Sequence, residues 1–404
     1  MNLRGYIAVT AAYWAFMLTD GALRMLVLLH FYELGFSPLQ LAWLFLLYEV
    51  AGIVTNLSAG FLAARFGLAM TLHAGLALQI VALLALARLD PNWAIGTSVV
   101  FVMLVQGLSG VAKDLAKTSS KSAVKLLTPD GTALFRLVAI LTGSKNAVKG
   151  IGFFLGAALL GGIGFAPALW AMAAVLGAIL LAVLAFLPRD LSTKDKGAKF
   201  KEVFSRDPRI NWLSAARLFL FGARDVWFVV ALPIWLAGTL SDGSNAGTRE
   251  AFFLTGGFMA LWIIGYGIVQ ANTPRLLRDG SVGKARAWVL GLAAIPAALA
   301  TIHWLTPAQP APVLVGLLAF GAVFAVNSAL HSFLILDFSK SARVTMDVGF
   351  YYMANAGGRL LGTLLSGLCY QLGGLALSLA VSAVMLLASA VALRAIPEAL
   401  PAQP

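Results

Sequence analysis

The sequence predicts an all-α membrane protein with twelve transmembrane helices in two six-helix bundles. Of its 404 residues, 60% are hydrophobic and only 11% are charged. The mean hydropathy of +0.88 is far above that of an ordinary soluble domain. Apolar runs of roughly 20 residues, the length needed to cross a hydrocarbon core of about 30 Å, recur along the whole chain with short polar breaks.

A long polar stretch at 188–209 divides the expected spans into six and six. It holds seven Lys or Arg residues and four acids, which is typical of a solvated cytoplasmic linker beside anionic lipid. The bundles are therefore expected at 1–187 and 210–404. The first contains spans at 6–31, 39–63, 69–89, 93–112, 133–160 and 167–187. The second contains spans at 210–236, 251–271, 285–305, 312–336, 346–370 and 375–394.

The basic residues set the expected orientation. Of the 29 Lys and Arg residues, only Arg88 and Arg249 fall in outer loops, and most of the others fall in inner loops or at inner helix ends. This bias places both termini in the cytoplasm and the chain in the inner cell membrane as a multi-pass protein. It also explains the net charge of +12 without a nucleic-acid partner. The single cysteine, Cys369, offers no disulfide framework, and we expect no cofactor and no metal site.

Lys145 and Lys149 are the most informative residues of the chain. They lie one helical turn apart near the middle of an apolar segment, 134–160, that contains no acid. A lysine at the centre of a spanning helix costs about 2.5 to 3.5 kcal/mol, so such residues usually line a substrate or ion path. Two on one face also repel each other. We therefore expect a bound anion, with a pair to Glu49 or Asp20 as the alternative.

Three further spans carry arginines. Asp20 and Arg24 are spaced i, i+4 with the acid first, which favours a mutual ion pair and leaves direct substrate contact by Arg24 as the alternative. Arg224 and Asp225 are adjacent and are expected to point in different directions, so Arg224 is a second substrate candidate.

Arg359 is a third candidate, since 359–362 repeats the cation and glycine spacing of 149–152. Arg217 is expected to extend toward the cytoplasmic end of its helix. Candidates for a polar lining around Arg359 are Tyr351, Tyr352, Asn327 and Asn355.

Positive charge is in excess among these central residues. The acids Asp20, Glu49 and Asp225 balance half of the six cations, and the rest favour a multiply charged anion such as phosphate or arsenate. The same three acids and His331 are candidates for ion pairing or coupling. His331 could exchange protons, or it could be a hydrogen-bonding packing residue.

Four lysines follow at intervals of four residues: Lys113, Lys117, Lys121 and Lys125. On a helix they would form one basic stripe at the cytoplasmic mouth. We interpret Lys113, Lys117 and Lys121 as a candidate funnel for anions, with contact to lipid headgroups as the alternative.

The arrangement resembles the major facilitator superfamily, whose halves are repeats around a midplane site. The loop at 60–67, GFLAARFG, resembles that superfamily's G-x-L-A-D-R-x-G loop, with Ala64 in place of the acid. More distinctive stretches are YWAFMLTDGALRMLVLLH at 13–30, KDLAKTSSKSAVK at 113–125, GSKNAVKG at 143–150 and FGARDVWFV at 221–229. In these the chain resembles the ArsJ-type organoarsenical efflux permeases.

That resemblance implies export of 1-arseno-3-phosphoglycerate, a product of glyceraldehyde-3-phosphate dehydrogenase acting with arsenate, and hence arsenate resistance. We expect a monomer working by rocker-switch alternating access, with the central cations lining the cavity. The alternatives are an organophosphate or organic-anion antiporter and a proton-coupled exporter of the same fold. We expect no enzyme, because the chain has none of the common hydrolase or nucleotide-binding motifs and no catalytic residues are assigned.

Overall fold

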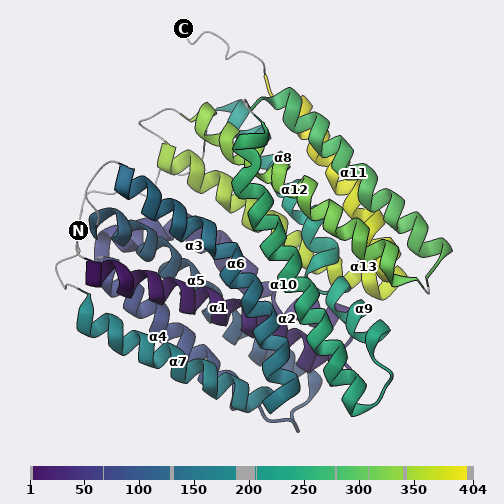
Figure 1. Ribbon diagram of the computed structural model, residues 1–404, viewed down its shortest axis with the longest axis horizontal. Helices are drawn as coiled ribbons and strands as arrows, with labels where there is room; N and C mark the ends of the chain where they lie inside the picture. Colours follow the sequence, from purple (N-terminus) through teal and green to yellow (C-terminus); the bar gives the residue numbers. More distant parts are fainter. Residues whose placement is uncertain are drawn as a thin grey trace. The chain divides into compact units, whose positions relative to one another are not determined.

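The structure is a computed structural model that describes residues 3–66, 68–127, 132–187, 205, 207–277, 280–307, 309–339 and 344–397. Within these ranges, side chains are described except at 3–4, 57, 59–66, 68, 121–127, 132–143, 274–276 and 344–346. All regular elements in the described ranges are helices (Figure 1).

Eleven helical stretches in the described residues are long and apolar enough to span a membrane. The last, Asp347–Arg394, contains two spans. Gly373 and Gly374 interrupt it with non-helical backbone, and Gly374 has a φ of 62°, which glycine adopts readily. The predicted twelve-helix fold class is therefore confirmed, including the break before the last span.

The chain divides into two compact units, which are described separately. Unit 1 comprises Met1–Lys199 and Pro233–Gly267, and unit 2 comprises Phe200–Leu232 and Ile268–Pro404. The division at 188–209 drawn from the sequence stays a prediction, because most of that stretch lies outside the described residues.

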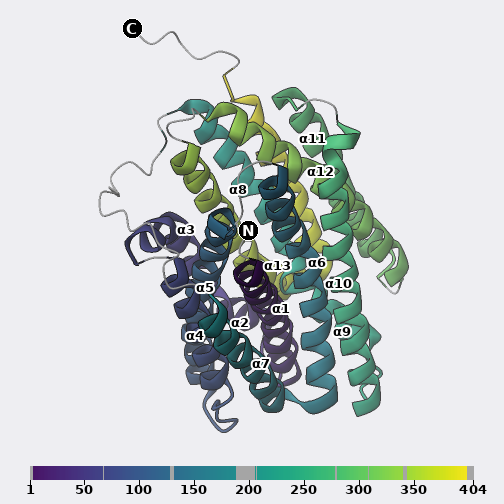
Figure 2. The same cartoon turned by 60° about the vertical axis from the view of Figure 1, so that its left-hand side comes forward.

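Unit 1 is built on the first seven helices, which pack on one another as Figure 2 shows. They are α1 (Leu3–Glu33), α2 (Pro38–Leu44), α3 (Leu46–Phe66), α4 (Leu68–Leu86), α5 (Ile95–Leu127), α6 (Thr132–Ile163) and α7 (Phe165–Phe186). Parts of α9 (Ala231–Leu240) and α10 (Asn245–Leu276) complete this unit.

Small residues bring α1 and α6 into backbone contact. A Cβ atom at Gly21 would lie 2.6 Å from the carbonyl oxygen of Lys149, and Cβ atoms at Gly152 and Gly156 would collide with the carbonyl oxygens of Leu18 and Ala22. Glycine is therefore required for this close approach. The contact fixes the charged residues of α1 opposite those of α6.

The second span is broken between α2 and α3 at Phe45. Ser37 and Gln40 form a capping box at the start of α2, with Pro38 in the first turn. The new helix α3 then carries Glu49 in its first turn. The break at Phe45 therefore determines the position of the Glu49 side chain in the interior of the unit.

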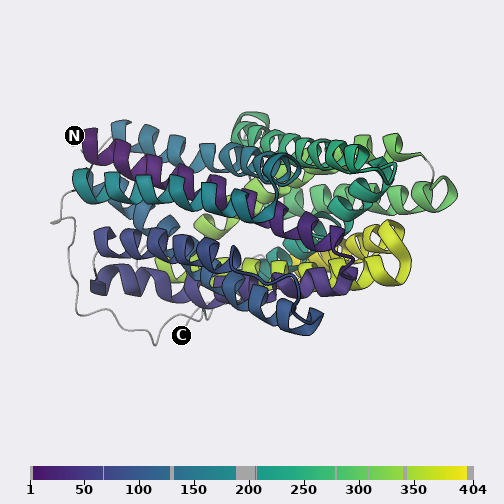
Figure 3. The same ribbon diagram turned by 90° about the horizontal axis from the view of Figure 1, so that it is seen from below.

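Unit 2 repeats the glycine contact. Its helices are α8 (Pro208–Phe228), α11 (Val282–Leu305), α12 (Pro310–Phe338) and α13 (Val344–Arg394), with the rest of α10. Figure 3 shows α13 in yellow-green and yellow. A Cβ atom at Gly362 would lie 2.6 Å from the carbonyl oxygen of Gly222, so α13 approaches α8 as closely as α6 approaches α1.

The seventh span is also broken, between α8 and α9. The side chain of Ser366 on α13 accepts hydrogen bonds from the backbone N–H groups of Val230 and Ala231, both at 3.1 Å. These N–H groups lie at the start of α9, where the backbone has no hydrogen-bond acceptor within the helix, so the Ser366 hydroxyl provides the acceptor. Ser366 lies seven residues after Arg359, and it ties the break to the helix that carries that cation.

Candidate functional site

Asp20 joins three elements of unit 1. Its carboxylate is almost fully buried and accepts a hydrogen bond of 2.5 Å from the Tyr48 hydroxyl. Its other oxygen lies 3.1 Å from Lys149 Nζ. Of the two interpretations of Lys149 left open by the sequence, the structure shows the pair with Asp20. This pair leaves 17% of the lysine side chain exposed and 1% of the aspartate.

Arg24 pairs with Glu49 and not with Asp20. Its guanidinium lies 2.9 Å from the Glu49 carboxylate, and it also stacks near the rings of Phe45 and Tyr48 at 5.0 and 5.5 Å. The predicted Asp20–Arg24 pair within α1 is therefore wrong. The i, i+4 argument considers one helix alone, whereas the glycine contact with α6 brings Lys149 to Asp20 and the break at Phe45 brings Glu49 to Arg24.

The basic residues of α5 are tied to a buried acid. Lys117 Nζ lies 3.1 Å and Lys113 Nζ 4.0 Å from the Asp114 carboxylate, which also accepts a 2.5 Å hydrogen bond from Thr55. Lys113 is 8% exposed and lies 4.1 Å above the Tyr48 ring.

Lys113 therefore does not belong to an open basic stripe, and the predicted funnel is wrong for this residue. Lys117, with 25% of its side chain exposed, faces more open space. The side chain of Lys121 lies outside the described residues. Lys113 instead connects the Asp114 cluster to the Asp20 cluster through the Tyr48 ring.

Lys145 lies one turn before Lys149 on α6 and is partly exposed. Its neighbour Ser144 accepts a 2.8 Å hydrogen bond from the indole N–H of Trp14 on α1. The polar face of α6 thus continues beyond Lys149 along the α1 contact. Lys145 stays a candidate for substrate contact.

Unit 2 holds a second buried carboxylate, Asp225, shared by two arginines. Arg224 Nε lies 2.6 Å from its Oδ1, and Arg359 Nε lies 3.4 Å from its Oδ2. The prediction that Arg224 and Asp225 point apart is wrong. Adjacent Cα–Cβ bonds do diverge, but the long arginine side chain bends back, and its guanidinium lies 5.0 Å from the Phe221 ring and 5.5 Å from the Phe324 ring.

Arg217 is buried within unit 2 at 4% exposure and does not extend to the end of its helix. Its guanidinium donates to Asn355 at 3.0 Å and to the backbone and hydroxyl of Ser328 at 3.2 and 3.3 Å. It stacks on Phe221 at 3.9 Å. The snorkelling interpretation is therefore wrong, and Asn355 serves Arg217. Among the described residues, no carboxylate pairs with Arg217.

His331 lies on α12 one turn after Ser328, and it is fully buried. Neither ring nitrogen has a hydrogen-bond partner in the described part of the protein. Burial fits the packing interpretation, whereas the lack of a partner leaves the imidazole able to hydrogen-bond a group that enters the unit. Its coupling role stays a prediction.

Sequence reasoning missed Tyr48 and Asp114. Asp114 could have been found, because it lies next to Lys113 and three residues before Lys117 on one helix. Tyr48 carried no such signal, since its role depends on the break at Phe45. The repeat inferred from the sequence has a structural counterpart. In each unit an acid on one helix, Asp20 or Asp225, pairs with a cation on the helix that packs against it through glycine.

Buried ion pairs within apolar helices can be exchanged for other partners. A bound oxyanion could take the place of Asp20 at Lys149 or of Asp225 at the two arginines, because guanidinium and ammonium groups bind phosphate-type oxygens as well as carboxylates. Buried ion pairs are seldom needed for stability alone, since well-packed apolar residues often stabilise a helix bundle equally well or better. Multiple apolar spans with charged pairs buried between them are typical of membrane transporters.

The comparisons assign the family. The chain belongs to the Major Facilitator Superfamily, whose profile matches residues 7–340. Its sequence has no significant match among curated proteins.

Solved structures agree on the fold. A crystal structure of the nucleoside transporter NupG is 14% identical with a TM-score of 0.74, covering 98% of this chain and 99% of that one. A mutant of NupG is 15% identical with a TM-score of 0.75 and the same coverage. A POT family transporter in complex with a thioalcohol-conjugated peptide is 13% identical with a TM-score of 0.71, covering 96% and 95%.

Proposed function

We propose that this transporter is an efflux permease for an anionic organoarsenical, 1-arseno-3-phosphoglycerate, and that it confers resistance to arsenate. Two related observations support the proposal. The stretches at 13–30, 113–125, 143–150 and 221–229 resemble the ArsJ-type permeases. Those same stretches supply most of the buried charged residues described above.

The main support for an anionic substrate comes from the arginines of unit 2. Arg224 and Arg359 contact one carboxylate, Asp225, and Arg217 is held by neutral groups alone in the described residues. Two guanidinium groups on one carboxylate, and a third held against the Phe221 ring by neutral groups, favour an anionic ligand over a neutral or cationic one. Arginine also suits oxyanions because its planar fork donates two parallel hydrogen bonds.

Substrate binding would proceed by exchange of partners in unit 1. An arsenate or phosphate group approaching Lys149 would displace Asp20, which keeps its hydrogen bond from Tyr48. Lys149 stays paired throughout the exchange, and the hydrogen bond from Tyr48 lowers the cost of leaving the Asp20 carboxylate buried without its cation. The returning carboxylate would then compete with the anion and assist its release, which an exporter requires.

The membrane potential would supply the driving force. A phosphate group carries about −1.5 to −2 charges near neutral pH, and the arsenylated substrate carries a net charge near −3. Its export from an inside-negative cell yields about 2.3 kcal/mol per charge per 100 mV, or about 7 kcal/mol in total. We propose uniport by alternating access, without obligatory proton exchange.

The location and partners follow from this function. We propose that both termini lie in the cytoplasm and that the chain is a monomer in the inner membrane, with the lipid bilayer as its surroundings. Its functional partner would be glyceraldehyde-3-phosphate dehydrogenase, which supplies the substrate. A second candidate is an organophosphate antiporter or proton-coupled exporter. It is favoured by one observation, the buried imidazole of His331, which has no hydrogen-bond partner among the described residues.

The test uses everted vesicles that contain the protein, supplied with the dehydrogenase, its substrate, NAD and arsenate. Arsenic accumulation that needs every component would support export of the arsenylated product. Accumulation with arsenate alone would indicate an inorganic oxyanion carrier. With folded protein shown to be present, no accumulation would contradict the proposal and favour the organophosphate antiporter.

A further inference from the structure

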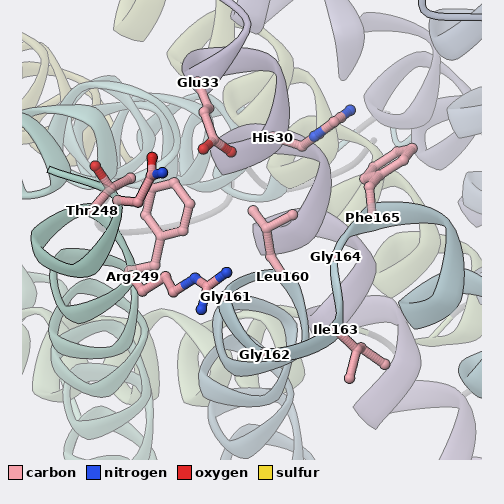
Figure 4. A pocket seen from close by; sticks show the side chains of 12 residues that line it. His30, Glu33, Leu160, Gly161, Gly162, Ile163, Gly164, Phe165, Thr248 and Arg249 are labelled. Carbon is pink, nitrogen blue, oxygen red and sulfur yellow. The ribbon is translucent and has the colours of Figure 1, made fainter. Parts of the chain in front are cut away.

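A cavity of about 520 Å³ lies within unit 1, and none of the buried ion-paired residues lines it. Its walls are the last turn of α1, the turn between α6 and α7, and the first turns of α10 (Figure 4). Four candidate spans begin or end here: Gly5–Glu33, Ser144–Ile163, Phe165–Phe186 and Asn245–Thr273. The cavity therefore lies at the level where the helices leave the hydrocarbon core, and its size is that of a small-molecule site.

Two opposite charges face the cavity from different walls. Glu33 extends into it from α1, and Arg249 extends into it from α10 (Figure 4). Both are exposed, and neither forms an ion pair or hydrogen bond with any other described residue. Arg249 is also one of only two basic residues in the predicted outer loops. Basic residues normally concentrate in cytoplasmic loops, so the positive-inside bias does not explain a basic residue in an outer loop.

The ends of the helices reinforce this polarity. α1 ends at Glu33, so its negative dipole end adds to the acid. α7 begins at Phe165 after Gly164, which provides no side-chain cap, and α10 begins at Asn245 close to Arg249. The free backbone N–H groups and the positive dipole end of α7 add to the arginine, whereas the Gly247 N–H in the first turn of α10 already donates to Ser244. One wall therefore favours a cation and the opposite walls favour an anion.

The turn between α6 and α7 leaves room for a ligand. Cβ atoms added at Gly162 or Gly164 would meet nothing within 4 Å. Ile163 lies in the same turn and is 50% exposed, which provides apolar surface beside the polar cavity. A ligand with a charged head and an apolar continuation would match both features.

We propose that this cavity binds a phosphoethanolamine-type zwitterion, with its phosphate at Arg249 and the start of α7 and its ammonium group at Glu33. The site is distinct from the transport site, since Glu33 would repel a substrate with a net charge near −3. The same chemistry is available from two sources, a phosphatidylethanolamine headgroup in the surrounding membrane or a soluble phosphoethanolamine ester. Both would make the same contacts, and only the lipid would also cover Ile163.

The soluble arm of the test measures binding of glycerophosphoethanolamine to the purified full-length protein by calorimetry, with glycerophosphoglycerol as the anion that lacks an amine. We expect the zwitterion to bind better. Arg249→Gln and Glu33→Gln should each weaken its binding about tenfold or more. Arg88→Gln is the matched control, because it removes the other outer cation outside the cavity and should change nothing.

The lipid arm measures retained lipid by native mass spectrometry after exposure to mixed micelles of phosphatidylethanolamine and phosphatidylglycerol. Preferential retention of phosphatidylethanolamine, lost in both cavity variants, would identify the lipid as the source. Binding in the soluble arm alone would identify a free ester. Glu33→Gln should also raise the affinity for the anionic phosphatidylglycerol headgroup. A misfolded variant would not gain affinity, so this result separates a change at the site from a loss of fold.

Equal binding of the zwitterion and the anion by the unmodified protein would overturn the proposal. So would binding that neither cavity substitution weakens, or no binding in either arm by protein of unchanged thermal stability.

Discussion

Lys149 Nζ of α6 lies 3.1 Å from Asp20 Oδ2 of α1, across a helix contact that requires glycine on both sides. The sequence predicts that the charge of Lys149 is balanced by a bound anion, but in the structure the carboxylate of Asp20 already balances it. This relationship changes the physics of binding. An anion does not fill an empty positive site; it replaces a carboxylate, and the affinity is the difference between two interactions.

The first prediction concerns this exchange. Lys149→Ala should abolish export, and Lys145→Ala should do the same, because both lose positive charge on the polar face of α6. Asp20→Asn should lower the KM for the anion, since the competing carboxylate is gone, and it should also slow turnover by slowing release. Initial rates in everted vesicles over a range of substrate concentrations would separate the two parameters.

Lys149→Arg is the control for charge at this position, and it should keep part of the activity. Membrane insertion of each variant must be checked by its yield in the membrane fraction. Unchanged transport by both alanine variants would remove the two lysines from the site, and an unchanged KM in Asp20→Asn would contradict the exchange.

The second prediction concerns Asp225. Its removal leaves Arg224 and Arg359 without their shared carboxylate in a buried setting, and breaking such a pair typically costs about 3 to 5 kcal/mol of stability. Asp225→Asn should therefore lower the thermal stability of the purified protein markedly. Adding an excess of the anionic substrate should recover part of that loss, because the anion can take the place of the carboxylate.

The double variant Asp225→Asn with Arg359→Gln provides the comparison. Removing both charges should be less destabilising than removing the acid alone, since only Arg224, and not both arginines, is then left without its carboxylate. Additive losses in the double variant would show that the two residues do not depend on each other.

The sequence predicted the architecture well because the signal is global. Hydropathy places the spans, including the separation of the last two at 346–370 and 375–394, whereas the division at 188–209 stays a prediction. Pairing among the charged residues was predicted poorly for a physical reason. The spacing along one helix predicts Asp20 as the partner of Arg24 and no pairing of Asp225 with Arg224. In the structure the break at Phe45 brings Glu49 to Arg24, and the close contact at Gly362 brings Arg359 to Asp225.

Arg217 and Tyr48 illustrate the same limit. A long side chain near a helix end can reach water or fold inward, and the sequence gives no means to decide. In the structure the ring of Phe221 and the side chains of Asn355 and Ser328 hold Arg217 inside unit 2. Aromatic and neutral polar residues of this kind are common throughout apolar spans, so their position alone carried no signal.

The third prediction tests the role of Arg217. Arg217→Lys should reduce transport strongly, because an ammonium group cannot stack on Phe221 or donate to Asn355 and Ser328 in the same fork geometry. Arg217→Met should abolish it while keeping or raising thermal stability, since a well-packed apolar side chain removes a buried charge. A stable methionine variant with normal transport would assign the arginine a structural role only.

The fourth prediction concerns the contact between α1 and α6. A Cβ atom at Gly156 would collide with the backbone of Ala22, so Gly156→Ala should destabilise the protein by about 1 to 3 kcal/mol through overpacking. Gly177→Ala on α7 is the matched control, because its Cβ would meet nothing within 4 Å. Thermal unfolding in detergent would compare the two. Equal stability of both variants would contradict the close approach.

The last prediction concerns the driving force. A substrate with a net charge near −3 gains about 7 kcal/mol per 100 mV on leaving an inside-negative cell, which suffices for export against a large concentration gradient. Collapsing the potential with a potassium ionophore at constant pH gradient should therefore stop net accumulation in everted vesicles. Collapsing the pH gradient at constant potential should leave it unchanged. The opposite pattern would favour a proton-coupled exporter, and His331→Ala would then be expected to abolish the dependence on pH.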